Sequence, residues 1–199
     1  TKLIRAGADK ICINTIAINN KKIITELADN FGSQAVIVSI DAKEHNGNYR
    51  VFSNLESKVI DLSPKFWAKK CEALGAGEIF LNSIDRDGSR KGYDSKLIKQ
   101  ITKNVKIPVI VCGGVGKFSH FTEGFKNNVS AVAASNIFHH IEHSTILAKA
   151  SLLRDKIDIR LDSIAKYSSC DFDDNGRLMM MTSKQLEQIE FKKRKYRFL

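Results

Sequence analysis

The residues of this sequence that could do chemistry follow short apolar runs. Asp41 comes directly after the Val- and Ile-rich run at 36–40, and a strand that is buried on both faces has no structural need of a terminal carboxylate. A carboxyl group in such a place can accept or donate a proton. Asp41 is therefore a candidate general acid or base, with a helix or loop cap as the alternative.

A second group of residues could hold an anion. Gly113, Gly114 and Gly116 let the backbone approach a ligand closely, and the start of the helix expected after them offers free N–H groups. Ala134 and Ser135 stand at the matching place one repeat later, and barrel enzymes often bind phosphate with the loops after their last two strands. Together these residues predict a phosphate site, although a lone Gly-Gly-x-Gly also serves ordinary tight turns.

Two further clusters carry titratable side chains. In the segment 83–88, Asp85 could equally be a second acid or part of a turn, whereas Asp87 is better suited to a ligand contact. The close spacing of His139, His140 and His143 invites a metal hypothesis. Because no carboxylate stands at a matching strand end, we expect no metal site.

The scaffold that must position these residues alternates strands with helices. The expected strands are short runs rich in Val and Ile, at 10–14, 35–41, 78–83, 109–112 and 131–135. The expected helices are amphipathic segments between and after them, at 21–31, 64–74, 95–104, 118–126 and 144–155. This alternation predicts an α/β fold of the (β/α)8 TIM barrel type, with five βα units over 1–162. A closed barrel needs eight units, so we expect roughly the first three to be absent from this chain.

Local signals predict where some elements begin. Asn46 and Gly47 predict the turn of a hairpin over 44–62, inserted after the second strand and placed above the catalytic face. Ser63 followed by Pro64 predicts a capped helix start. Four aromatic side chains on helical segments are expected to pack against the barrel: Phe66, Trp67, Phe121 and Phe125.

Composition narrows the class of protein. The 199 residues are 43% hydrophobic, which suits one domain with a sizeable core, and no apolar run is long enough to cross a bilayer. Four widely spaced cysteines favour reduced thiols in a cytoplasmic protein. The net charge of +10 suits phosphorylated ligands, an acidic partner or nucleic acid. The densest basic run, 192–197, lies in a predicted extension over 163–199 without a nucleic-acid module, so we expect neither nucleic-acid nor membrane binding.

Several distinctive motifs stand in register along the chain. They include Gly-Ala-Asp-Lys-Ile-Cys-Ile-Asn-Thr at 7–15, Ile-Asp-Ala-Lys at 40–43, Ser-Ile-Asp-Arg-Asp-Gly at 83–88 and Ala-Ala-Ser at 133–135. Together they closely resemble one enzyme family, the cyclase subunit of imidazole glycerol phosphate synthase. The likeness continues to about residue 161.

The resemblance implies a barrel that needs no cofactor. It would use ammonia from a glutaminase partner, docked at the N-terminal face, to convert a phosphorylated ribulosyl aminoimidazole carboxamide nucleotide to imidazole glycerol phosphate in histidine biosynthesis. Asp41 matches one of two catalytic aspartates, and the other belongs to the first strand of the barrel. Lys10 and Glu78 match the charged ring that gates ammonia, with a plain structural ion pair as the alternative.

The resemblance also implies which residues hold the substrate. Asn14 and Thr15 would hold one phosphate or the substrate beside it, and Gly114 and Ser135 would hold the other phosphate. The remaining expected contacts are Asn82, Asp87, Cys112, Gly113 and Ala134.

Three departures from the family pattern open an alternative. Cys12 and Cys112 stand where serine is common, and Asn82 stands where threonine is common. With the extension at 163–199, these residues resemble divergent paralogues that supply ammonia for amidino-sugar formation in lipopolysaccharide or other surface-polysaccharide biosynthesis. A non-catalytic barrel scaffold is a further alternative, against which the retention of Asp41 and the glycine loops argues.

Overall fold

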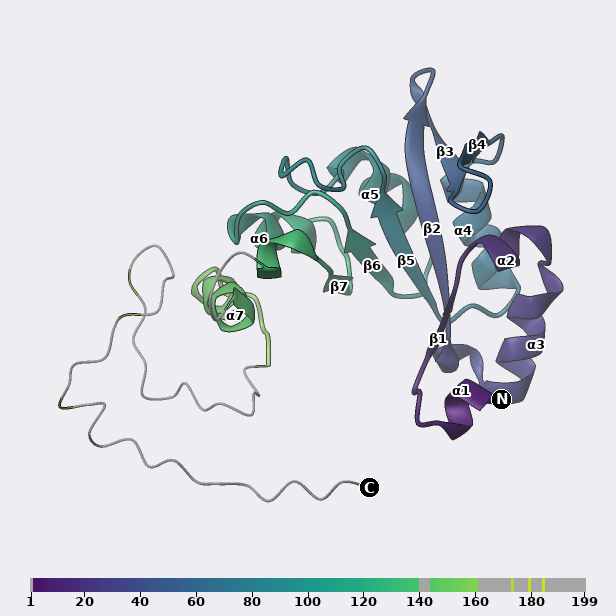
Figure 1. Ribbon diagram of the computed structural model, residues 1–199, viewed down its shortest axis with the longest axis horizontal. Helices are drawn as coiled ribbons and strands as arrows, with labels where there is room; N and C mark the ends of the chain where they lie inside the picture. The colour runs from purple at the N-terminus through teal and green to yellow at the C-terminus, as the bar shows by residue number, and fades with distance from the viewer. Residues whose placement is uncertain (1, 140–143, 161–172, 174–178, 180–183, 185–199) are drawn as a thin grey trace.

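The computed structural model describes residues 2–139, 144–160, 173, 179 and 184, and its centre is a mostly parallel sheet (Figure 1). Five parallel strands lie side by side in chain order: β1 (Ile11–Ile13), β2 (Val36–His45), β5 (Glu78–Ser83), β6 (Val109–Cys112) and β7 (Ala131–Val132). Parallel neighbours in chain order are the arrangement found in consecutive units of a (β/α)8 barrel. The predicted α/β class is confirmed.

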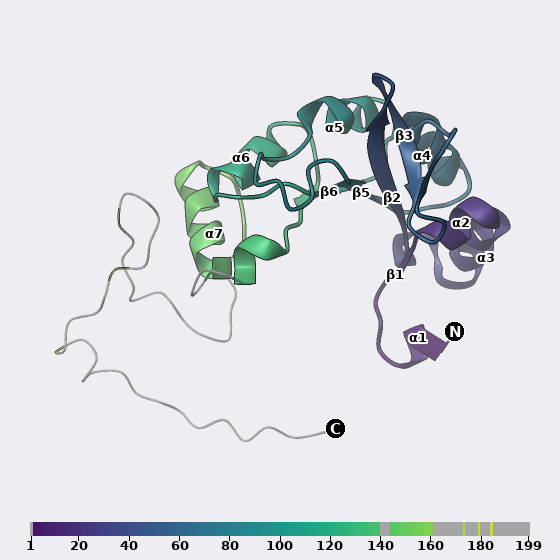
Figure 2. The ribbon, with the colours of Figure 1, turned by 45° about the horizontal axis from the view of Figure 1, so that its top comes forward.

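Helices follow the parallel strands (Figures 1 and 2). The α-helices are α1 (Lys2–Arg5), α2 (Thr15–Asn19), α3 (Lys22–Phe31), α4 (Pro64–Ala73), α5 (Ser95–Thr102), α6 (Ser119–Phe125) and α7 (Ser144–Arg154). Two 3₁₀ turns, η1 (Ser33–Ala35) and η2 (Asn136–His139), complete the described helical elements. The five main helices lie within two residues of their predicted ranges, whereas the short α2 was not predicted.

The two faces of the sheet differ, because alternate residues of a strand point to opposite sides. Val36, Val38 and Ile40 of β2 are buried in one core cluster with Ile24 of α3 and Trp67 of α4. The residues between them on β2, beginning with Ile37 and Ser39, are only partly buried. Asp41 belongs to the same row as Ile37 and Ser39, so the strand places the candidate catalytic carboxylate on the face away from the helical core.

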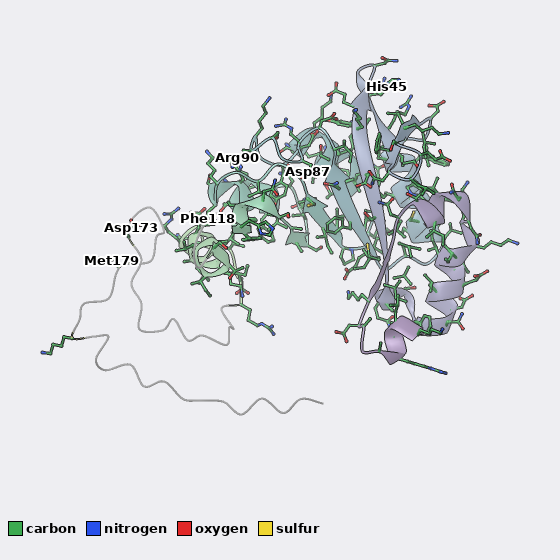
Figure 3. All side chains as sticks on the ribbon, in the orientation of Figure 1. His45, Asp87, Arg90, Phe118, Asp173 and Met179 are labelled. Carbon is green, nitrogen blue, oxygen red and sulfur yellow. The ribbon has the colours of Figure 1, made fainter. Side chains whose placement is uncertain are left out.

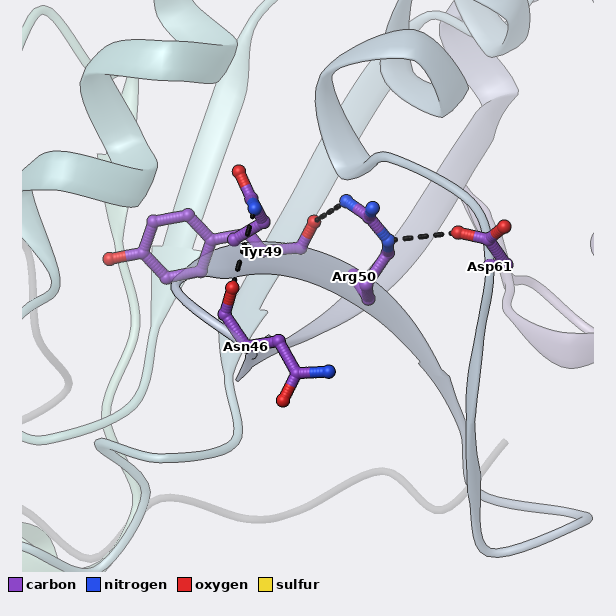
Figure 4. Close-up of polar contacts among 5 residues, drawn as sticks. Asn46, Tyr49, Arg50 and Asp61 are labelled. Carbon is purple, nitrogen blue, oxygen red and sulfur yellow. Dashed lines mark hydrogen bonds and ion pairs between the residues drawn. The ribbon is translucent and has the colours of Figure 1, made fainter.

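A hairpin rises from the end of β2, as predicted for 44–62. β2 pairs antiparallel with β3 (Asn48–Ser53), which pairs with β4 (Lys58–Ile60). The turn residues Asn46 and Gly47 have φ values of 50° and 76°, as a two-residue hairpin turn with both residues at positive φ requires. Arg50 braces the hairpin, donating to Asp61 Oδ1 at 3.0 Å and to the Tyr49 carbonyl at 3.2 Å (Figure 4).

One local prediction was confirmed in part and another was wrong. Helix α4 begins at Pro64 directly after Ser63, as predicted, but the Ser63 side chain makes no capping hydrogen bond. Phe66 is 63% exposed instead of packing against the barrel. Trp67 and Cys71, four residues apart on α4, are buried, and Phe66 lies off that side of the helix.

The boundaries at the two ends of the chain also differ from expectation. The strand predicted at 131–135 ends at Val132, and η2 begins four residues later, at Asn136. The strand predicted at 10–14 covers only Ile11–Ile13. Most of the predicted extension at 163–199 lies outside the described residues.

Candidate active site at the strand ends

Three asparagine side chains surround the carboxylate of Asp41, which is only 4% exposed. Asn14 Nδ2 donates to Asp41 Oδ2 at 2.6 Å, and Asn54 Nδ2 donates to the same oxygen. Asn82 Nδ2 donates to Oδ1 at 3.0 Å. Each of these three Nδ2 groups can donate a hydrogen bond to an ionised carboxylate. None of the three Nδ2 groups can accept the hydrogen bond that the O–H of a carboxylic acid would donate. We call Asp41 with Asn14, Asn54 and Asn82 the amide cage.

Separate elements bring the members of the amide cage together. Asp41 and Asn82 are direct partners in the parallel register of β2 and β5, and Asn14 follows β1, on the other side of β2. Asn54 comes from the turn between β3 and β4. The strand pairing therefore positions two donors, and the hairpin contributes the third.

Two acceptors beside the carboxylate are unused among the described residues. Asn14 Oδ1 and Asn82 Oδ1 are buried and have no hydrogen-bond partner there. A buried carbonyl oxygen without a donor costs free energy, so such groups point to a ligand or to water. Together with the Asp41 carboxylate, these oxygens suit a group rich in N–H or O–H donors.

Two thiols near Asp41 are held in the neutral form. Burial raises the pKa of Cys12 above its ordinary value, and the negative charge of Asp41 adds to this effect. Burial also raises the pKa of Cys112, as do the charges of Asp87 and Asp41, against a lowering by the Gly113 backbone hydrogen bond. Neither thiol has the lowered pKa of an activated nucleophile.

A pocket that is partly open to solvent, which we call the glycine pocket, lies at the ends of β6 and β7. It brings together the predicted residues Asp87, Cys112, Gly113, Gly114, Ala134 and Ser135, along with Gly88, Arg90, Val115 and Asn136. Figure 3 shows Asp87 and Arg90 toward the same end of the sheet as His45 of the hairpin. The predicted anion-binding residues thus share one cavity, which has a cation at Arg90 and one carboxylate at Asp87.

The glycines of this pocket are required by close backbone approach. Gly113 and Gly114 have φ values of 98° and 101°, and a Cβ on Gly114 would lie 2.3 Å from the Gly92 carbonyl oxygen. Gly92 N–H donates to the Gly114 carbonyl at 2.7 Å, which joins the two loops. His120 Nδ1 accepts the Gly116 N–H at 3.1 Å, and burial lowers the pKa of His120, which favours the neutral ring that can accept.

The predicted gate residues also meet. Lys10 Nζ donates to Glu78 Oε1. Glu78 is the first residue of β5, so this ion pair lies at the opposite end of the strand from Asn82. The contact is compatible with both an ammonia gate and a structural ion pair, because the two have the same geometry.

Other predicted residues take different places. Thr15 begins α2 next to Asn14 and does not line the glycine pocket. Asp85 accepts the Glu44 N–H at 2.7 Å, so its carboxylate fixes the base of the hairpin, as an ordinary turn residue would.

Three contributors to the site were missed from the sequence. Asn54 could not be found without the hairpin register that brings it to Asp41. Arg90 follows the segment 83–88 closely and could have been found as a basic side chain in a predicted ligand loop. The role of His120 could not be found from the sequence, because it depends on how α6 packs against the glycine loop.

Nothing among the described residues suggests a metal or membrane site. No cluster of three or more His, Cys, Asp or Glu side chains is placed to hold a metal, and no helix in this part of the chain is long and apolar enough to span a bilayer. His140 and His143 of the metal hypothesis lie outside the described residues. The described cysteines, Cys12, Cys71 and Cys112, are free thiols.

Comparison with protein families matches residues 1–144 to the family described as histidine biosynthesis protein. Imidazole glycerol phosphate synthase subunit HisF of Chloroherpeton thalassium is 46% identical over 156 residues, or 78% of this chain and 62% of that protein. The corresponding subunit of Thermotoga sp. strain RQ2 is 40% identical over 164 residues, or 82% of this chain and 65% of that protein.

A Vibrio vulnificus protein with the provisional name imidazole glycerol phosphate synthase subunit hisF2 is also similar. The two are 46% identical over 176 residues, which are 88% of this chain and 65% of that protein. The chain thus spans less than two thirds of the length of these relatives.

Proposed function

The chain belongs to the histidine biosynthesis protein family, in the branch of the imidazole glycerol phosphate synthase cyclase subunits, and we propose from this that it is such a cyclase. The family has the TIM barrel fold. In the proposed reaction, ammonia and a phosphorylated ribulosyl aminoimidazole carboxamide nucleotide give imidazole glycerol phosphate, an aminoimidazole carboxamide ribotide and water.

The observation that carries this proposal is the buried Asp41 carboxylate at a strand end, with the glycine pocket two strands away. Condensing ammonia with a carbonyl and closing a ring both need protons to be removed from nitrogen and given to a leaving oxygen. Asp41 is an acid–base group of the required kind, and the unused oxygens of Asn14 and Asn82 could accept N–H donors of the substrate or of ammonia.

The glycine pocket suits one phosphate of the substrate. Gly113, Gly114 and Ser135 would hold it with backbone N–H groups, and the guanidinium of Arg90 supplies a positive charge. Cys112, Asp87 and Ala134 would line the wall. Asn14 and Thr15, at the start of α2, would contact the substrate toward its second phosphate.

The proposal extends to the partner. The relatives are named as subunits, and we propose that a glutaminase supplies ammonia at the end of the barrel marked by Lys10 and Glu78. On this account the five units over 1–162 form the ammonia-using part of a heterodimer in the cytoplasm. The extension at 163–199 is proposed as a separate basic segment.

A second candidate function is supply of ammonia for amidino-sugar formation. Its support is Asn82, which stands where threonine is common and donates to Asp41, together with the provisional hisF2 name of the Vibrio relative. A paralogue of this kind would keep the barrel and the glutaminase partner but would not turn over the histidine-pathway nucleotide.

Ammonia-dependent turnover by the full-length protein distinguishes the two functions. Loss of nucleotide absorbance with wild type, absent with Asp41→Asn, is the result expected of a cyclase. A folded wild type that binds phosphate but does not consume the nucleotide would exclude the cyclase and favour the sugar-modifying paralogue.

A further inference from the structure

The hairpin does more than cover the site, because its turn supplies Asn54 to the amide cage. The turn is braced by its own bonds: Ser53 Oγ accepts the Glu56 N–H at 3.3 Å, and Ser57 Oγ donates to the Asn54 carbonyl at 3.4 Å. Ser53 is buried, whereas Asn54 is exposed. The Asn54 amide therefore reaches the buried Asp41 carboxylate from the solvent side, on a turn that does not depend on this amide for its shape.

The hydrogen bonds to Asp41 are divided unequally between its oxygens. A carboxylate has about four lone-pair positions, two on each oxygen. Asn14 and Asn54 occupy both positions on Oδ2, while Asn82 occupies one on Oδ1. Among the described residues, the position that remains unoccupied is on Oδ1, and a proton from a substrate would be taken there.

We infer that Asn54 is a positioning residue for Asp41, one that no strand of the barrel supplies. Its amide saturates Oδ2, fixes the plane of the carboxylate, and leaves Oδ1 as the single oxygen that can exchange a proton with substrate. The inference rests on the proposed cyclase function, because it assigns the orientation of the group that would do the proton transfer.

The experiment compares Asn54→Leu and Asn54→Asp with wild type in ammonia-dependent nucleotide turnover by the full-length protein. Asn54→Leu keeps the size and removes the donor, so kcat should fall by about 10- to 100-fold with KM changed by less than about threefold. Asn54→Asp puts a like charge against Asp41 and should lower kcat further.

Asn48→Ala is the matched control. It removes an asparagine amide from the same hairpin, where that amide bonds only to the Asn46 carbonyl at 3.4 Å in the turn. It should leave kcat and KM within about twofold of wild type. A thermal unfolding curve for each variant shows whether the fold is retained.

Three results would overturn the inference, and they are distinguishable. If Asp41→Asn is inactive but Asn54→Leu keeps wild-type kcat, or raises only KM, the inference fails and the cyclase function stands. If Asn48→Ala lowers kcat as much as Asn54→Leu, the effect belongs to the hairpin as a whole. If wild type has no turnover, the proposed function fails and the inference fails with it.

Discussion

Two regions at the strand ends of this molecule are built in opposite ways. The amide cage on β1, β2 and β5 consists of side chains directed at one carboxylate. The glycine pocket at β6 and β7 is shaped by backbone, with Gly114 packed against the Gly92 carbonyl. The amide cage should therefore be disrupted by substitutions that remove side-chain atoms, and the glycine pocket by substitutions that add them.

The division follows the chemistry each region is proposed to do. Proton transfer needs a titratable group held at a fixed orientation, which only side chains can supply. Phosphate binding needs several N–H donors close together, which backbone at positive φ offers without any particular side chain.

Gly114→Ala should greatly weaken phosphate binding by the glycine pocket. Its Cβ would meet the Gly92 carbonyl at 2.3 Å and its φ is 101°, so we expect about a 100-fold loss of affinity from strain and overpacking together. Titration with inorganic phosphate measures it. Gly7→Ala is the control, because Gly7 has nearly the same φ, 99°, with nothing within 4 Å of the added Cβ. Equal damage by both variants would mean that a general loss of stability, and not the close contact with the Gly92 carbonyl, weakens phosphate binding.

Lys10→Met should act at the opposite end of the strands from the amide cage. Removing the ion pair with Glu78 would change glutamine-dependent turnover by about tenfold if the pair gates ammonia, while turnover with added ammonium salt stays within about threefold. Parallel assays with the two nitrogen sources measure this. Equal effects in both assays would support the purely structural reading, for which a stability loss below about 1 kcal/mol is expected.

The glycine pocket should loosen at acid pH through His120. Burial lowers the pKa of His120, with Lys117 acting in the same direction and Glu123 opposing it. The unfolded chain therefore takes up a proton near its ordinary pKa of 6.5 before the folded protein does, so stability falls as pH drops below that value.

Thermal unfolding between pH 7.5 and about 5.5, without phosphate, measures this loss of stability. His120→Asn keeps an acceptor for the Gly116 N–H and removes the titration, so the difference in slope between wild type and variant isolates His120. Identical slopes would mean that other groups cause the acid sensitivity.

Ser135→Ala should have the smallest effect. If backbone N–H groups hold the phosphate, losing one hydroxyl should weaken phosphate affinity by no more than about threefold. A loss close to that of Gly114→Ala would show that the pocket works through side chains, and the contrast between the two regions would be wrong.

The sequence was most informative where a residue type is unusual for its place. Asp41 after a buried strand and the glycines at 113–116 identified two regions, and the βα alternation gave the strand order. Strand register then brought Asp41 beside Asn82. These features depend on local pattern and on the periodicity of strands, which a single sequence contains.

What could not be predicted depends on contacts between distant segments. Nothing in the sequence around Asn54 indicates that the turn of the hairpin reaches Asp41, since that contact requires the twist and length of β2 and β3 together. Phe66 was placed in the core because a large aromatic side chain on a helix usually packs there, but the side of α4 that faces the sheet is set by Trp67 and Cys71.

The most direct test of the account is to measure binding and turnover separately in the full-length Asp41→Asn variant. Because the glycine pocket is built without Asp41, the nucleotide Kd should stay within about threefold of wild type, while kcat falls by about 10² or more. A variant that keeps its kcat, or that loses nucleotide binding together with turnover, would contradict the claim that Asp41 does proton transfer on a substrate whose phosphate is held elsewhere.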